Sequence, residues 1–143
     1  MKKGALVVLI FGTVLAVTAY TFSRRQYFSS KDPLLDQVRE NFGKLDPKYK
    51  EIPLRVGDSA YTENKEVITL CLIDPETNLP YDINTIMYVA LHELAHVTSN
   101  EVGHGNIFKT NFSNLLKKAA SVGIYNPRKP IPMSYCHVKT GSH

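Results

Sequence analysis

Residues 84–98 read Asn-Thr-Ile-Met-Tyr-Val-Ala-Leu-His-Glu-Leu-Ala-His-Val-Thr, and this stretch decides the fold. Apolar side chains recur along it at helical spacing and form a wide face: Ile86, Ala90, Leu91, Leu94 and Val97. This pattern predicts a buried helix over the stretch, with Asp82 as its N-cap. Three polar residues, His92, Glu93 and His96, stand in the same helix, where such side chains are costly unless something satisfies them.

The spacing of those three residues is typical of a catalytic zinc site. Histidines four residues apart on a helix lie on one face, one turn apart, so both rings can bind one ion at about 2.0–2.1 Å. Glu93 points about 100° away around the helix. A carboxylate there can take a proton from a water activated by zinc and pass it to a leaving amine. The alternative interpretation is two surface histidines on an amphipathic helix.

A catalytic zinc site needs a third protein ligand and an open fourth position. We predict His104 as that ligand, because Gly103 lets the chain turn back towards the metal and the helix expected after it would hold the ring in place. The other candidates are Glu101, then the tail histidines His137 and His143. Tyr135 could offer a hydroxyl to a developing oxyanion, but a tyrosine that packs in the core is the favoured interpretation.

The chain around this helix predicts a small α+β domain with an antiparallel or mixed sheet. The expected elements are a helix from Asp32 to Gly43, strands over residues 52–56, 61–62 and 67–73, and a helix from about Asn106 to Val122. Residues 67–73 are nearly all apolar or β-branched, which favours a central strand. The tail from Asn126 contains several prolines and is expected to be irregular.

An apolar run stands at the N-terminus. The run from Gly4 to Phe22 has no charged residue, and two basic residues flank it on either side: Lys2, Lys3, Arg24 and Arg25. Because a helix needs roughly 20 such residues to cross a bilayer, residues 1–29 predict a transmembrane anchor with a short linker, ahead of one domain over residues 30–143. The alternative is a cleavable signal peptide, with Val17-Thr18-Ala19 as the cleavage site.

Charge and cysteine content narrow the function classes. The net charge of +4 comes entirely from the four flanking basic residues, since residues 31–143 carry 13 Lys or Arg and 13 Asp or Glu. The sequence pI near 9.0 is therefore no nucleic-acid signal, and we expect no nucleic-acid partner. Cys71 and Cys136 are too few for a disulfide framework, and a bridge between them depends on the compartment.

The motifs resemble those of the WLM and SprT-like zincin metallopeptidases. The resemblance rests on His92-Glu93-Leu94-Ala95-His96, the Gly103-His104 pair and the aromatic-bearing helix that follows. The stretch from Leu70-Cys71-Leu72-Ile73-Asp74 to His104, with Tyr135-Cys136, is similar to small WLM-like peptidases of large DNA viruses. The resemblance covers residues 60–137. It implies a minimal zincin-like domain, zinc held by His92, His96 and His104, Glu93 as general base, and peptides bound extended along a sheet edge.

Together these observations predict a single-pass, membrane-anchored zinc metallopeptidase that cleaves protein or peptide substrates. If the chain is viral, the membrane is expected to be that of the host or the virion. Two other functions stay open: a non-catalytic membrane protein with a structural zinc site, and a DNA-associated protease like those of the SprT group. The pattern leaves the oligomeric state open.

Overall fold

The computed structural model describes residues 12–18 and 32–140. Contacts divide the chain into two units, Met1–Ser30 and Lys31–His143. In the first, residues 12–18 form a helix with exposed side chains. The rest of the apolar run that predicts an anchor lies outside the described residues. Across the two described ranges, no helix combines the length and the apolar character that a membrane crossing requires.

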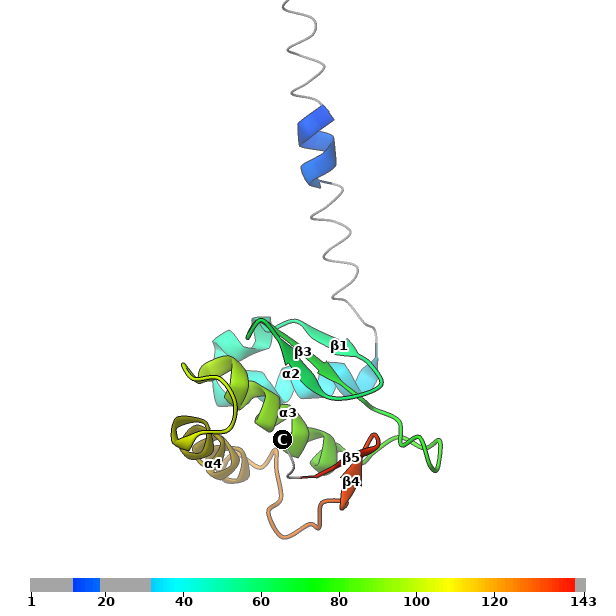
Figure 1. The fold of residues 1–143 in the computed structure, drawn as a ribbon, viewed down its shortest axis with the longest axis vertical. Helices are drawn as coiled ribbons and strands as arrows, with labels where there is room; N and C mark the ends of the chain where they lie inside the picture. Colours follow the sequence, from blue (N-terminus) through cyan, green and yellow to red (C-terminus); the bar gives the residue numbers. More distant parts are fainter. Residues whose placement is uncertain (1–11, 19–31, 141–143) are drawn as a thin grey trace, which may run out of the picture. The chain divides into compact units, whose positions relative to one another are not determined.

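The predicted buried helix is α3 (Ile83–Thr98), and it lies between the three-stranded sheet and α4 (Asn106–Ser121), as Figure 1 shows. Asp82 is its N-cap: one carboxylate oxygen accepts the N–H groups of Asn84 and Thr85, at 3.0 and 3.3 Å. Ten of its 16 residues are buried. The predicted cap and end are confirmed, and the helix begins one residue before the predicted stretch.

The sheet is mixed, in the order β1-β3-β2. Its strands are β1 (Leu54–Val56), β2 (Tyr61–Glu63) and β3 (Val67–Leu70), with β1 parallel and β2 antiparallel to β3. All four residues of β3 are buried, which confirms it as the central strand. The strand ends at Leu70, before the expected residue 73, because the next residues turn away from the sheet to a disulfide at Cys71 and an isolated bridge between Ile73 and Pro80.

The first helix of the domain is α2 (Pro33–Leu45), followed by the short 3-10 helix η1 (Pro47–Glu51). Asp32 caps α2 as expected, accepting the N–H of Leu34 at 2.9 Å. The predicted end at Gly43 is wrong. The helix continues to Leu45 because that side chain is buried in the core, and the N–H of Asp46 then bonds the carbonyl of Phe42 at 3.1 Å.

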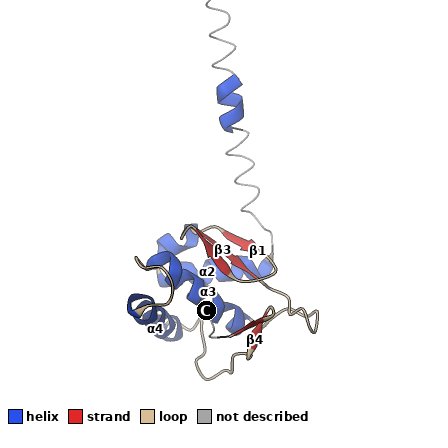
Figure 2. Ribbon diagram, in the orientation of Figure 1, coloured by secondary structure: helices blue, strands red, loops and turns tan. Residues whose placement is uncertain are grey.

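The segment after α4 contains regular structure that the sequence did not predict. Gly123, at φ +77°, turns the chain out of the helix as left-handed glycines commonly do. Within the tail, β4 (Ser134–Tyr135) and β5 (Val138–Lys139) form an antiparallel hairpin, seen in Figure 2 beside α3. The expectation of an irregular tail is therefore wrong for this part, because long-range contacts of the hairpin turn hold it. The elements together confirm the α+β fold with a small mixed sheet.

Candidate metal centre

The last two turns of α3 present His92 and His96 side by side, one turn apart. Both rings are half-buried, whereas Leu91, Leu94 and Ala95 between and beside them are fully buried. The apolar residues seal the helix against the core, and this leaves the histidine face towards a cleft. The helix pattern and the three-dimensional placement thus agree.

His104 reaches the same point from the loop between α3 and α4. Its Nε2 atom lies 3.1 Å from that of His92 and 3.0 Å from that of His96, and the latter two are 3.3 Å apart. Zinc–nitrogen distances of 2.0–2.1 Å in a tetrahedral site require ligand nitrogens about 3.3–3.4 Å apart. The three histidines therefore fit a tetrahedral ion with small adjustments, and they form a group that could hold a metal.

The loop that carries His104 turns at Gly103, whose φ is +82°. A residue with a side chain is strained in this conformation, so glycine suits the turn that the sequence predicted. Glu101, the second candidate ligand, has another role. Its carboxylate accepts the N–H of Phe108 at 2.5 Å in the first turn of α4, where four N–H groups lack helix partners. It also fills the space beside Gly105, where a Cβ atom would lie 2.6 Å from Oε2.

Phe108 is a site residue that sequence reasoning missed. Its ring is buried and packs against all three histidines, with ring centroids 4.9 Å from His92, 4.4 Å from His96 and 4.7 Å from His104. In the sequence it is only one residue of the helix predicted from about Asn106 to Val122. It forms the apolar wall behind the metal centre and limits how the three rings can rotate.

Glu93 is buried beside this centre. The hydroxyl of Thr62, on β2, donates to its carboxylate at 2.7 Å and lies 3.1 Å from its backbone oxygen. Burial raises the pKa of Glu93 to about 6, and the hydrogen bond from Thr62 opposes this shift. The carboxylate is thus held in one orientation by the sheet, with a pKa close to that of an effective acid or base at neutral pH.

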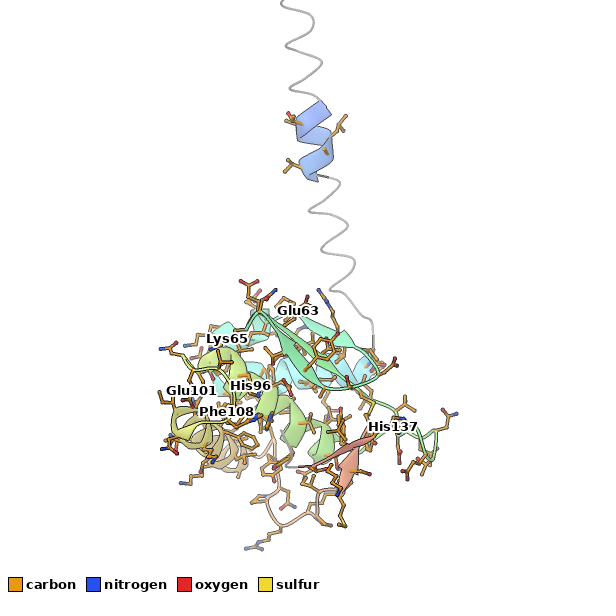
Figure 3. All side chains as sticks on the ribbon, in the orientation of Figure 1. Glu63, Lys65, His96, Glu101, Phe108 and His137 are labelled. Carbon is orange, nitrogen blue, oxygen red and sulfur yellow. A yellow bond between two sulfur atoms is a disulfide. The ribbon has the colours of Figure 1, made fainter. Side chains whose placement is uncertain are left out.

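A cleft of about 310 Å³ joins these groups. One wall is the edge strand β2 with the residue before it, through Ala60, Tyr61 and Thr62, and the floor is α3, through the two histidines and Glu93. The loop over residues 101–104 forms the opposite wall. Figure 3 shows His96, Phe108, Glu101 and Lys65 gathered at this end of the domain. A metal ion held by the three histidines would face this cleft, which Glu93 also lines.

The other candidate residues lie elsewhere or have other partners. His137 is exposed and lines a different cavity with Cys71 and Leu72, away from the cluster, as Figure 3 also shows. The hydroxyl of Tyr135 donates to the carbonyl of Cys71, and burial raises the pKa of Tyr135. This residue is therefore a tyrosine that packs in the core. His143 lies outside the described residues.

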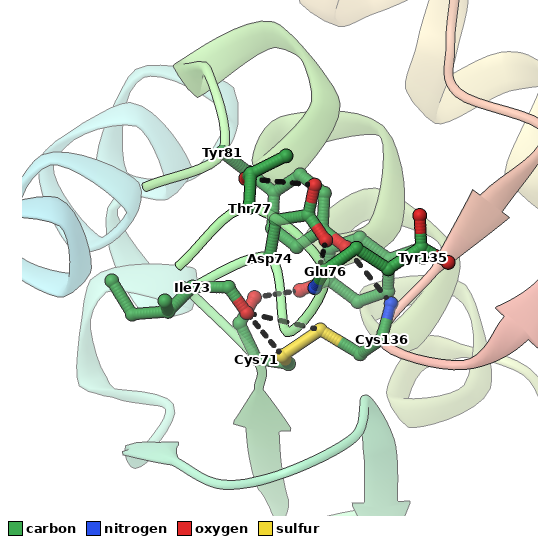
Figure 4. Close-up of a disulfide and its surroundings, with 8 residues drawn as sticks. All are labelled: Cys71, Ile73, Asp74, Glu76, Thr77, Tyr81, Tyr135 and Cys136. Carbon is green, nitrogen blue, oxygen red and sulfur yellow. Dashed lines mark hydrogen bonds between the residues drawn. A yellow bond between two sulfur atoms is a disulfide. The ribbon is translucent and has the colours of Figure 1, made fainter. Parts of the chain in front are cut away.

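A disulfide joins Cys71, just after β3, to Cys136 in the turn of the β4–β5 hairpin, with Cα atoms 6.4 Å apart (Figure 4). The hydroxyl of Tyr81 accepts the N–H of Cys136 at 3.0 Å, and the Tyr81 and Tyr135 rings pack at 4.8 Å. The bridge that the sequence left open is therefore formed. It places the hairpin next to α3, where Tyr135 and Val138 line a small cavity together with His92 and Glu93.

Comparison with known proteins gives relatives in viruses. An uncharacterized protein of Invertebrate iridescent virus 3 is 47% identical over 88 residues, which cover 62% of this chain and 55% of the relative. The chain is homologous to uncharacterized proteins of large DNA viruses. A second relative, from Invertebrate iridescent virus 6, is 41% identical over 88 residues, covering 60% of this chain and 49% of its own length. A third, from Acanthamoeba polyphaga mimivirus, is 34% identical over 111 residues, which cover 76% of this chain and 56% of the relative.

These comparisons confirm the expected similarity to proteins of large DNA viruses. The chain spans about half the length of the relatives that it matches. No protein-family model matches it. No solved structure matches it either. Because the relatives are uncharacterized, they assign no activity to this chain.

Proposed function

We propose that this chain is a zinc-dependent metallopeptidase of the WLM and SprT-like type. His92, His96 and His104 would hold the ion, and Glu93 would be the general base. One observation carries the proposal: three Nε2 atoms within 3.3 Å of one another share a cleft with a buried carboxylate held by Thr62. Among the described residues no fourth histidine, cysteine or carboxylate joins the three, which suits an open catalytic position.

Each residue then has a chemical task. A bound zinc ion would lower the pKa of a water molecule and polarise the substrate carbonyl. Glu93 takes the proton from the attacking water as the new C–O bond forms. It then gives this proton to the amide nitrogen as the C–N bond breaks, so that the carboxylate is restored. Thr62 keeps the carboxylate pointed into the cleft during both transfers.

The substrate would be a peptide in an extended conformation. β2 is an edge strand of the sheet, and three consecutive residues, Ala60 to Thr62, line the cleft. Edge strands pair readily with an extended peptide through backbone hydrogen bonds. Such a peptide would run along the edge strand and over the three histidines, and this places one of its carbonyl groups at the metal.

The location that we propose is a membrane. The uncharged apolar run from Gly4 to Phe22 would anchor the chain through residues 1–29 as a single-pass protein of a host or virion membrane, with the peptidase domain over residues 30–143. We expect the full chain to stay in the membrane pellet after extraction at alkaline pH. Its release into the supernatant would contradict the anchor and would favour the cleaved signal peptide.

The zinc content of the purified full chain tests the metal centre. We expect one zinc ion per chain by mass spectrometry of metals, and a loss of this zinc in His92→Ala and His104→Ala, because two ligands bind far more weakly than three. His137→Ala is the matched control, since this histidine is exposed and lies away from the cluster. A chelator should abolish peptide cleavage, and added zinc should restore it.

Three results would contradict the proposal. A folded full chain without any bound metal would leave the histidine cluster without a catalytic role. Zinc bound at full occupancy in His104→Ala would move the third ligand away from the loop between α3 and α4. Zinc-loaded protein that cleaves no peptide would favour the structural zinc site over the peptidase.

A further inference from the structure

A lysine outside the histidine cluster connects the sheet to the loop of the third ligand. Lys65 lies in the turn between β2 and β3, with a left-handed φ of 57°. Its Nζ atom donates to the carbonyl oxygen of Ser99 at 2.6 Å and to that of Glu101 at 2.8 Å. These contacts join residues that are 34 and 36 positions apart in the sequence. Lys65 itself lines the cleft.

The two carbonyl groups belong to the segment that determines where His104 lies. Ser99 is the C-cap residue of α3, and Glu101 precedes His104 by three residues. A cation is favourable at the C-terminal end of a helix, where carbonyl groups point outward without helix partners. Lys65 satisfies such a carbonyl and the next part of the loop with one charged group.

Contacts from α4 hold the same segment from the other side. The amide of Asn111 donates to the Ser99 hydroxyl at 3.1 Å and to the Thr98 hydroxyl at 2.7 Å. The Glu101 carboxylate bonds the first turn of α4. The loop that carries His104 is thus fastened to α4 by these bonds and to the sheet by Lys65.

We propose that Lys65 is a positioning residue of the metal centre, which holds the loop over residues 99–105 so that His104 stays within reach of the ion bound by α3. The role rests on the proposed metal site. The lysine bonds backbone atoms of the loop. It acts through two backbone carbonyls, so its removal lets the loop move away and lowers metal affinity without removing a ligand.

Zinc affinity of the full chain tests this role. We expect Lys65→Met to weaken zinc binding about tenfold, the lower end of the loss seen when groups that support metal ligands are removed. Lys65→Arg keeps the charge and the donors and should stay within about threefold of the unmodified chain. Affinity is measured by competition with a chromophoric chelator. The absorption spectrum of the Co²⁺-loaded protein reports the ligand geometry.

The control is Lys129→Met, because Lys129 also joins distant segments, through Asp82 at 2.9 Å, but does so away from the cleft. It should leave zinc affinity and the Co²⁺ spectrum unchanged. Unfolding by urea with chelator present measures the stability of each metal-free variant, and we expect Lys65→Met and Lys129→Met to differ little there. A weaker affinity for zinc and a changed Co²⁺ spectrum in Lys65→Met alone would support the role.

Equal zinc affinity in Lys65→Met and the unmodified chain would overturn the role of Lys65 and leave the proposed peptidase intact. An equal loss of affinity in Lys129→Met would also overturn it, because the effect would then follow general stability. Absence of zinc from the unmodified chain would overturn the proposed function itself, and the role of Lys65 with it.

Discussion

Glu93→Gln is expected to lower peptide cleavage by about two to four orders of magnitude while zinc stays bound, because general acid–base catalysis contributes on that scale. Glutamine has nearly the shape of glutamate, and its amide oxygen can still accept the hydroxyl of Thr62. It cannot take a proton from water at neutral pH. The three histidines, which form the metal cluster without Glu93, are unchanged.

The measurement is cleavage of an unstructured protein substrate by the zinc-loaded full chain, with zinc counted in the same samples. Glu63→Gln is the matched control: this carboxylate lies on the same strand as Thr62, is half-exposed, and pairs with Arg55 at 3.1 Å. It should keep full activity. Cleavage by Glu93→Gln at the rate of the unmodified chain would rule out Glu93 as the general base.

Removal of the disulfide has the largest expected effect on stability. We expect the double variant Cys71→Ala, Cys136→Ala to lose about 4 kcal/mol of unfolding free energy, since the bridge closes a loop of 65 residues and so restricts the unfolded chain. The conformation of the hairpin turn makes the stability of the chain depend further on the disulfide. Cys136 and His137 both have positive φ, 47° and 70°, a conformation that residues with side chains rarely adopt.

Urea unfolding with and without a reductant measures this effect. The unmodified chain should lose its stability advantage when reduced, and the double variant should not respond to reductant. A difference below about 1 kcal/mol between oxidised and reduced protein would contradict the prediction, since loop-closure entropy for a loop of this length is several times larger. Peptide cleavage by the reduced protein would then show how far the site depends on the hairpin.

The parts of the fold that sequence reasoning predicted well have short-range causes. Asp32 and Asp82 cap helices because a carboxylate bonds N–H groups two or three residues away. The end of α4, at Ser121 against the predicted Val122, likewise follows from a few residues. The helix end predicted at Gly43 was wrong for the opposite reason. A glycine near the end of a helical pattern predicts that the helix stops, but the burial of Leu45 two residues later extends α2.

The residues of the metal centre also differ in how far the sequence alone could predict them. His92 and His96 were predictable as a pair because helix geometry alone places residues four apart on one face. His104 was predictable only as a preference over Glu101. The structure distinguishes the two: the Glu101 carboxylate bonds the first turn of α4, and the His104 ring turns towards the α3 histidines.

By itself the sequence determined the helix with its two histidines and one glutamate, the caps, and the alternation of helices and strands, because each depends on neighbours within a few residues. Only the tertiary structure decided that Thr62 orients Glu93, that Phe108 lies behind all three histidines, and that Lys65 reaches the loop of His104. Thr62 is 31 residues from Glu93, Lys65 is 34 residues from Ser99, and Phe108 is 16 and 12 residues from the two histidines of α3. No spacing rule connects such distant positions, since they meet only when burial of the apolar core brings the sheet and α4 onto α3.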